Sequence, residues 1–134
     1  MEYTIENDHI KGDLGFGEIV ISPCETKGYR PYELFVSSLA GCSGSLLRTI
    51  LTKRRMSFEK IKIEVTAVRN PDQANRVEQL SFSARVYTEV PFTTQQADKI
   101  AHLVVKNCGL IQSVLQSIDV KFTIQYTSLN GSSN

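Results

Sequence analysis

One uncharged run constrains the fold of this chain more than any other feature: the fourteen residues LFVSSLAGCSGSLL, from Leu34 to Leu47. A membrane-spanning helix needs about 20 apolar residues, whereas this run is shorter and contains four serines. From Pro31 onward, apolar residues recur every three or four positions along two stripes, Phe35, Leu39, Cys42, Leu46 and Ile50, and Val36, Ala40, Leu47 and Leu51. The pattern predicts a buried helix of about 20 residues that starts near Pro31 and is central to the fold.

Composition limits the class of protein around this helix. With 134 residues and 41% hydrophobic residues, we expect one domain over residues 1–128 and a disordered tail over 129–134. The net charge is +1, and basic residues occur singly except in Lys53-Arg54-Arg55, so nucleic acid is not the expected partner. Those three cations suit the negative end of a helix dipole. The charged N-terminus lacks a signal-peptide pattern, which predicts a cytoplasmic protein without a membrane anchor.

The rest of the chain predicts short strands and two smaller helices. Alternating patterns before residue 22 indicate antiparallel hairpins, and the same alternation recurs over 61–67, 80–86 and 120–126. Thr93 and Gln96 form a capping-box pattern before one amphipathic helix, and Asn107 is a candidate cap for another. The predicted fold class is α+β, with antiparallel strands packed against one long central helix and a helix pair.

The three cysteines carry the candidate chemistry. Cys42 lies among small residues mid-helix, and buried packing and reactivity are both open interpretations. Cys108 directly precedes a predicted helix, where backbone N–H groups stabilise a thiolate, and the small Gly109 would leave its sulfur accessible. An unreactive thiol packed at the helix entry is an equally good interpretation of Cys108. Cys24 lies in a loop, and its role is open. His9 and His102 lack a metal-ligand spacing, so no metal is expected.

Two motifs together resemble the OsmC/Ohr family of thiol-dependent peroxidases. The first is Pro31, Glu33-Leu34 and LAGC from Leu39 to Cys42, which is similar to the family's P-x-E-L…A-x-C helix; the second is NCGLIQSV from Asn107 to Val114. The resemblance implies an intertwined homodimer with antiparallel sheets around the long helix. It also implies that Cys42 reduces an organic hydroperoxide, that Cys108 resolves the sulfenic acid to a disulfide, and that a dithiol, such as a lipoylated protein, restores both thiols without a cofactor.

The sequence departs from the family at the position that supports the first cysteine. Family members use an arginine oriented by a glutamate ten positions before that cysteine, and here that position is Tyr32. Glu33 lies nine positions before Cys42, about 180° away around a regular helix, so it is expected to stabilise the helix N-terminus. Arg30 is the best local candidate for the activating cation. Arg69, Arg76, Arg85 and the partner subunit are the alternatives.

Two further functions fit the same sequence. The first is a non-enzymatic protein on the same scaffold that binds a small ligand or senses oxidation, which Tyr32 in place of the glutamate favours. The second is a purely structural dimer with inert, buried cysteines, in which neither thiol would react with labelling reagents in the native state.

Overall fold

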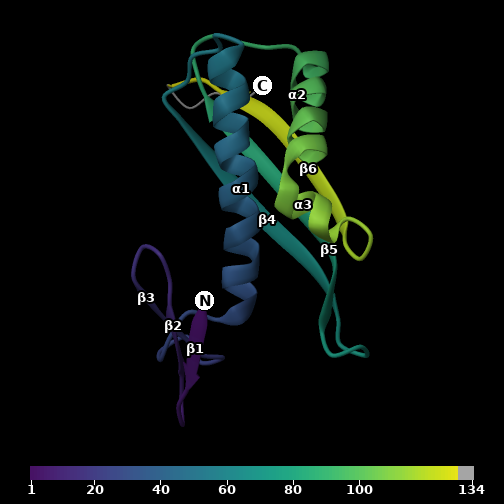
Figure 1. Cartoon of the computed structure of the whole chain (residues 1–134). Helices are drawn as coiled ribbons and strands as arrows, with labels where there is room; N and C mark the ends of the chain where they lie inside the picture. The colour runs from purple at the N-terminus through teal and green to yellow at the C-terminus, as the bar shows by residue number, and fades with distance from the viewer. Residues whose placement is uncertain (130–134) are drawn as a thin grey trace. The chain divides into compact units, whose positions relative to one another are not determined.

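The computed structural model describes residues 1–129, which form two compact units, residues 1–38 and the chain from residue 39 onward. The expected tail residues 130–134 lie outside the described residues, and the single domain over 1–128 stays a prediction. The first unit contains a three-stranded antiparallel sheet of β1 (Glu2–Ile5), β2 (Ile10–Asp13) and β3 (Glu18–Ile21), in that order (Figure 1). The predicted N-terminal hairpins are confirmed.

The helix predicted from Pro31 is α1 (Pro31–Lys53). Its fully buried residues are Leu39, Ser43, Leu47 and Leu51, which recur every four positions and form one line along the helix. The predicted stripes omitted Ser43 because serine is polar. Its hydroxyl is nevertheless satisfied in the interior, since it donates a 2.8 Å hydrogen bond to the carbonyl of Leu39. By length and composition alone α1 could cross a membrane, which is weak evidence, and 22% of its most apolar window is buried within the described structure.

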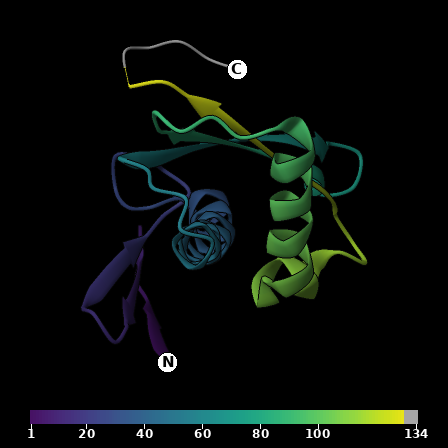
Figure 2. The ribbon, with the colours of Figure 1, turned by 90° about the horizontal axis from the view of Figure 1, so that it is seen from above.

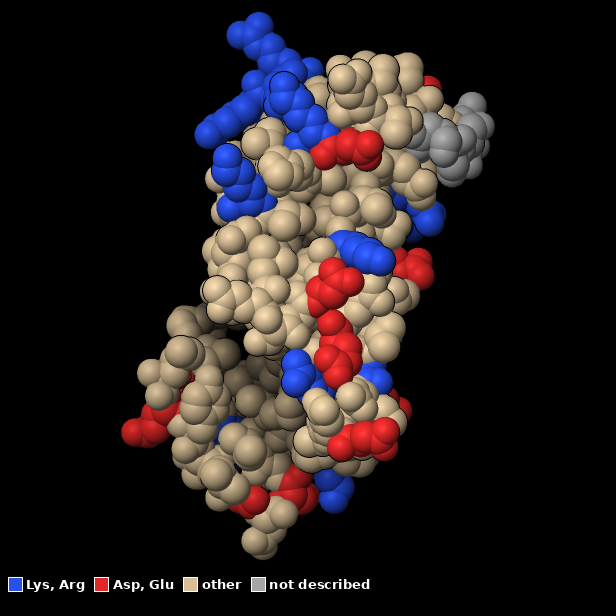
Figure 3. Space-filling model, turned by 90° about the vertical axis from the view of Figure 1, so that its right-hand side faces the viewer, with Lys and Arg blue, Asp and Glu red and all other residues tan. Residues whose placement is uncertain are grey.

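α1 ends at the basic segment Lys53-Arg54-Arg55, where the backbone turns out of the helical conformation. Arg55 has a positive φ of 57°, its N–H donates to the carbonyl of Thr52, and the N–H of Met56 donates to the carbonyl of Leu51. These two bonds are those of a Schellman motif, with arginine at the position that glycine usually occupies. Figure 3 shows Lys and Arg side chains gathered at one end of the molecule, and the exposed Lys53, Arg54 and Arg55 stand where α1 ends.

A second sheet contains β4 (Lys60–Asn70), β5 (Arg76–Tyr87) and β6 (Asp119–Thr127), in that order. The first two form a long antiparallel hairpin with a register shift between Val68 and Arg69. Both strands extend beyond the predicted ranges of 61–67 and 80–86.

The prediction of purely antiparallel strands is wrong for β6, which pairs with β5 in parallel. Two helices, α2 (Thr94–Asn107) and α3 (Gly109–Val114), lie between these strands in sequence. They carry the chain back to the starting end of β5, so β6 must run in the same direction as β5. The Thr93–Gln96 capping box is confirmed, but Asn107 is the last residue of α2, and Cys108 rather than Asn107 precedes α3.

The core of this unit lies on one face of the second sheet. Figure 2 shows α2 and the part of α1 from Leu39 onward on the same side of the sheet. The strand residues on that side are largely buried, among them Leu80, Phe82, Ala84 and Val86 of β5. Residues of alternate parity, such as Lys60, Lys62 and Glu64 of β4, are exposed on the opposite face. We call this opposite face the outer face of the sheet.

Candidate active site

Two cysteines that are 66 positions apart in sequence meet in the structure. Cys42 lies in α1 and Cys108 at the junction of α2 and α3, and their sulfur atoms are 3.2 Å apart, with the Cys108 thiol donating toward the Cys42 sulfur. Both cysteines are free thiols. A disulfide requires a sulfur separation of about 2.05 Å, so the pair could be joined by a movement of about 1 Å.

Backbone hydrogen bonds fix Cys108 between two helices. Its N–H donates to the carbonyl of Val104 at 2.9 Å, which closes α2, and its carbonyl accepts from the N–H of Gln112 at 2.9 Å in α3. The residue is 1% exposed, contrary to the expectation that Gly109 would leave its sulfur accessible. Burial raises the pKa of the Cys108 thiol, more than the N–H of Ile111 lowers it, and the contact with Cys42 raises it further. Cys108 therefore favours the protonated form.

Cys42 is the more accessible member of the pair, being half-buried on α1. Small neighbours allow this part of the helix to approach the sheet. A Cβ atom on Gly44 would stand 3.3 Å from Cδ1 of Ile63, so the glycine permits close contact with β4. The next helical position after Cys42, Ser43, is fully buried. Ser43 and Gly44 thus have a packing function within a single chain.

The residues proposed to support Cys42 lie around the start of α1. Nε of Arg30 donates to a carboxylate oxygen of Glu33 at 2.8 Å. This hydrogen-bonded ion pair raises the pKa of Arg30 and lowers that of Glu33. Glu33 is also the acidic residue of the first helical turn, as expected, and Tyr32 beside it is half-buried. Glu33, which points away from Cys42 on the helix, therefore forms an ion pair with Arg30, the arginine that the sequence analysis favoured as the activating cation.

The other candidate arginines point elsewhere. Nε of Arg69 donates to the carbonyl of Asn75, and Arg76 pairs with Glu78 at 3.4 Å. Arg85 lies on the outer face of the sheet, by strand alternation opposite to the buried side chains of β5. Within the described residues from 39 to 129, no hydrogen bond or ion pair joins a basic side chain to either sulfur.

A hollow of about 340 Å³ lies beside α1. Its lining is mainly apolar and contains Ala40, Gly41, Gly44, Ser45, Arg48, Phe58, Ile61 and Ile63. Neither cysteine of the pair belongs to that lining. The hollow and the thiols are therefore two separate features of the same helix.

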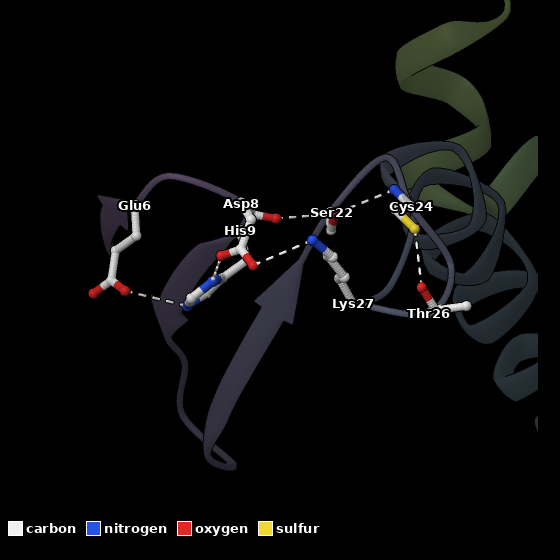
Figure 4. Close-up of polar contacts among 7 residues, drawn as sticks. All are labelled: Glu6, Asp8, His9, Ser22, Cys24, Thr26 and Lys27. Atoms are coloured by element: carbon white, nitrogen blue, oxygen red, sulfur yellow. Dashed lines mark hydrogen bonds and ion pairs between the residues drawn. The ribbon is translucent and has the colours of Figure 1, made fainter.

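Cys24 belongs to a different cluster, in the first unit, shown in Figure 4. Its exposed sulfur lies 3.0 Å from the hydroxyl of Thr26, and this hydrogen bond lowers the pKa of the thiol. Nearby, His9 lies 2.7 Å from a carboxylate oxygen of Asp8, which also pairs with Lys27 at 3.5 Å. Cys24 is thus an exposed thiol outside the cysteine pair.

His9 lies beside the carboxylates of Glu6 and Asp8, but these three side chains do not form a group that could hold a metal ion. His102 is exposed on α2, and within residues 1–129 no group of three or more His, Cys, Asp or Glu side chains could hold a metal ion.

Comparison with known proteins gives one family and several similar structures. A family model described as OsmC-like protein matches residues 24–123. A hypothetical protein from Aquifex aeolicus has a TM-score of 0.83 at 22% identity, covering 95% of this chain and 94% of that one. The organic hydroperoxide resistance protein OsmC from Legionella pneumophila has a TM-score of 0.65 at 16% identity, covering 92% and 93%.

A third structure, the organic hydroperoxide resistance protein OhrB of Bacillus subtilis, has a TM-score of 0.61 at 17% identity, covering 92% of this chain and 96% of that one. No curated protein sequence matches the chain. The structural likenesses establish the fold, and the match over residues 24–123 establishes the family.

Proposed function

Because the chain belongs to the OsmC-like protein family, we propose that it is a thiol-dependent peroxidase that reduces organic hydroperoxides to alcohols. The observation that carries the proposal is the 3.2 Å separation between the sulfur atoms of Cys42 and Cys108. Two thiols this close can form a transient disulfide, which is the chemistry that such an enzyme needs. The names of the similar proteins from Legionella pneumophila and Bacillus subtilis point to the same class of substrate.

Cys42 is the residue that attacks the peroxide. It is half-buried, whereas Cys108 is 1% exposed, so a substrate reaches Cys42 first. The Cys108 thiol stays protonated and donates its hydrogen bond to the Cys42 sulfur, which stabilises negative charge there. The Cys42 thiolate attacks one peroxide oxygen and the O–O bond breaks. The alkoxide takes up a proton and leaves as the alcohol, and Cys42 becomes a sulfenic acid.

Cys108 then resolves the sulfenic acid. Its sulfur attacks that of Cys42, the S–S bond forms, and the hydroxyl group leaves as water with the proton from Cys108. A dithiol reductant restores the two thiols by disulfide exchange and becomes oxidised to its own disulfide. Rapid closure of the disulfide protects Cys42 from further oxidation to a sulfinic acid.

Arg30 and Glu33 are the proposed supporting pair. The ion pair at 2.8 Å keeps the guanidinium oriented and fully charged, as an activating cation must be. Glu33 stands one position later than the family glutamate, and Tyr32 occupies the family position. Twelve positions of helical rise, about 18 Å, separate Arg30 from Cys42 of the same chain, so we propose the pair as the support of Cys42 in a partner subunit.

The test is a single-turnover reaction. The reduced protein is mixed with one equivalent of cumene hydroperoxide, quenched with an alkylating reagent, and its disulfides are mapped by peptide mass. We expect a fast Cys42–Cys108 disulfide, lost in Cys42→Ser and Cys108→Ser. Cys24→Ser is the matched control, because it removes an exposed thiol outside the pair and should leave the link intact.

Multiple turnover with a dithiol, such as dihydrolipoamide, separates the peroxidase from the alternative function. Steady peroxide consumption that disappears in Cys42→Ser supports the enzyme. If oxidation is slow and stoichiometric, without turnover, the protein is instead a redox sensor or a binding protein. The hollow of about 340 Å³ beside α1 is the observation that favours a small ligand in that case.

A further inference from the structure

A group of basic side chains lies on the outer face of the second sheet, away from both cysteines of the pair. Lys60 and Lys62 come from β4, and Arg85 and Tyr87 from β5. The antiparallel register sets Lys60 opposite Tyr87 and Lys62 opposite Arg85. The two ammonium groups stand over the same phenol ring, with Nζ of Lys60 4.8 Å and Nζ of Lys62 5.6 Å from the ring centre. Lys60 and Lys62 thus make cation–π contacts with Tyr87, and Arg85 lies directly opposite Lys62 on the neighbouring strand.

This arrangement is electrostatically unfavourable without an anion. Like charges directly opposite each other on neighbouring strands repel, and Lys62 and Arg85 are such a pair. Among the described residues, none of the three cations forms an ion pair with a carboxylate. Their combined field is strong enough to lower the pKa of Tyr87, chiefly through the hydrogen bond from Arg85.

Two of the cations, Lys62 and Arg85, line a hollow of about 250 Å³ together with Ile63, Glu64 and Ser83. This volume is several times the roughly 30 Å³ that one water molecule occupies in the liquid. The hydroxyl of Ser83, exposed on β5 opposite Glu64 and two positions before Arg85, is an additional hydrogen-bond donor. Glu64 is the acidic member of the lining, so the lining carries two positive charges and one negative charge, and Lys60 lies outside it, over the ring of Tyr87.

We propose that this hollow binds a phosphate group, either as inorganic phosphate or as part of a phosphate monoester. The two cations of the lining outnumber its one carboxylate, and Lys60 over the Tyr87 ring adds a further positive charge nearby, which favours an anionic ligand. The guanidinium of Arg85, the ammonium group of Lys62 and the hydroxyl of Ser83 supply hydrogen-bond donors from two neighbouring strands, which suits an oxyanion. The site lies on the face of the sheet opposite to the helices that carry Cys42 and Cys108, and it is independent of the proposed peroxidase function.

The test measures phosphate binding to the full chain. Inorganic phosphate is titrated at constant ionic strength, and binding is followed by amide chemical shifts of β4 and β5. Loss of one charged hydrogen-bond donor should weaken binding by about tenfold in Lys62→Gln and in Arg85→Gln. Lys121→Gln is the matched control, because Lys121 is an exposed lysine on the same face of the sheet, in β6, and does not line the hollow.

Glu64→Gln tests the sign of the electrostatic argument. It removes the carboxylate from the lining, so phosphate should bind more tightly than to the wild type. Glycerol phosphate identifies the source: tighter binding than inorganic phosphate indicates a monoester, and equal binding indicates that the phosphate group alone is recognised. The proposal is overturned if acetate binds as well as phosphate, if Lys121→Gln weakens binding as much as Lys62→Gln, or if no shifts occur in β4 and β5.

Discussion

At the scale of single residues, the two sulfur atoms of the cysteine pair differ in environment, and the proposed roles of Cys42 and Cys108 rest on this difference. The buried Cys108 thiol keeps its proton and donates a hydrogen bond, while the half-buried Cys42 receives it. A protonated resolving thiol does not compete for the peroxide, because the thiolate is the reactive form. Burial of one cysteine therefore directs the first reaction to the other.

The raised pKa of Cys108 predicts a pH dependence of stability. An unfolded thiol titrates near pH 8.5, and the folded state holds the proton more tightly. The contribution to stability is thus fully present below about pH 8.5 and is lost as the pH rises through the higher folded-state pKa. Urea unfolding under reducing conditions, from pH 7 to pH 10, should show a steeper loss of unfolding free energy in the wild type than in Cys108→Ala.

Cys24→Ala provides the comparison for that experiment. Cys24 is exposed and its pKa is lowered rather than raised, so the variant should keep the steep loss of the wild type above pH 8.5. Parallel profiles for the wild type and Cys108→Ala would show that Cys108 is not held in its protonated form.

At the scale of elements, α2 connects the sheet to Cys108, and its first turn is closed by the capping box. The hydroxyl of Thr93 accepts from the N–H of Gln96 at 3.0 Å, and the side chain of Gln96 accepts from the N–H of Thr93 at 2.8 Å. Thr93→Ala should lower the unfolding free energy by about 1 kcal/mol, measured by urea denaturation. Thr94→Ala, at the next position, should change it by less than about 0.5 kcal/mol. If Thr93→Ala and Thr94→Ala lower the unfolding free energy equally, the capping box does not stabilise the protein.

The same elements show which features the sequence could predict. The capping box depends on residues three positions apart, so local chemistry alone identified it. The direction of β6 depends on the path of the chain through α2 and α3, which no local pattern reports. Ser43 was not predicted to be in the core because serine is polar. It can be buried because its hydroxyl donates a hydrogen bond to the carbonyl of Leu39, which the apolar pattern does not reveal.

The site was predictable only in part. Cys42 and Cys108 were singled out from their motifs, but their approach to 3.2 Å follows from folding across 66 positions. The Arg30–Glu33 ion pair needed side-chain geometry, since helical spacing alone directed Glu33 away from Cys42. The cluster on the outer face of the sheet depends on strand register, which sets Lys62 opposite Arg85 although they are 23 positions apart.

At the scale of the whole molecule, two features of the second unit suit an interface with another chain. β4 is an edge strand of eleven residues, and such edges commonly pair with another chain. Gly41 is exposed on α1, and a Cβ atom there would meet nothing within 4 Å. An exposed glycine destabilises a helix interior by roughly 0.5–1 kcal/mol relative to alanine, so a partner helix packed closely against Gly41 would explain its presence. We therefore propose the homodimer that the family resemblance implies.

Substitution of Gly41 tests the dimer without disturbing the single chain. The wild type should have a mass of about 30 kDa by light scattering during gel filtration, twice the 15.0 kDa of one chain. Gly41→Leu should shift this mass toward 15.0 kDa, because the new side chain is tolerated within the chain but clashes with a partner. Gly15→Leu is the matched control, since Gly15 is equally open but lies in a loop of the first unit. If Gly41→Leu keeps the wild-type mass, the partner does not pack against this face of α1; a wild type of 15.0 kDa would exclude the dimer altogether.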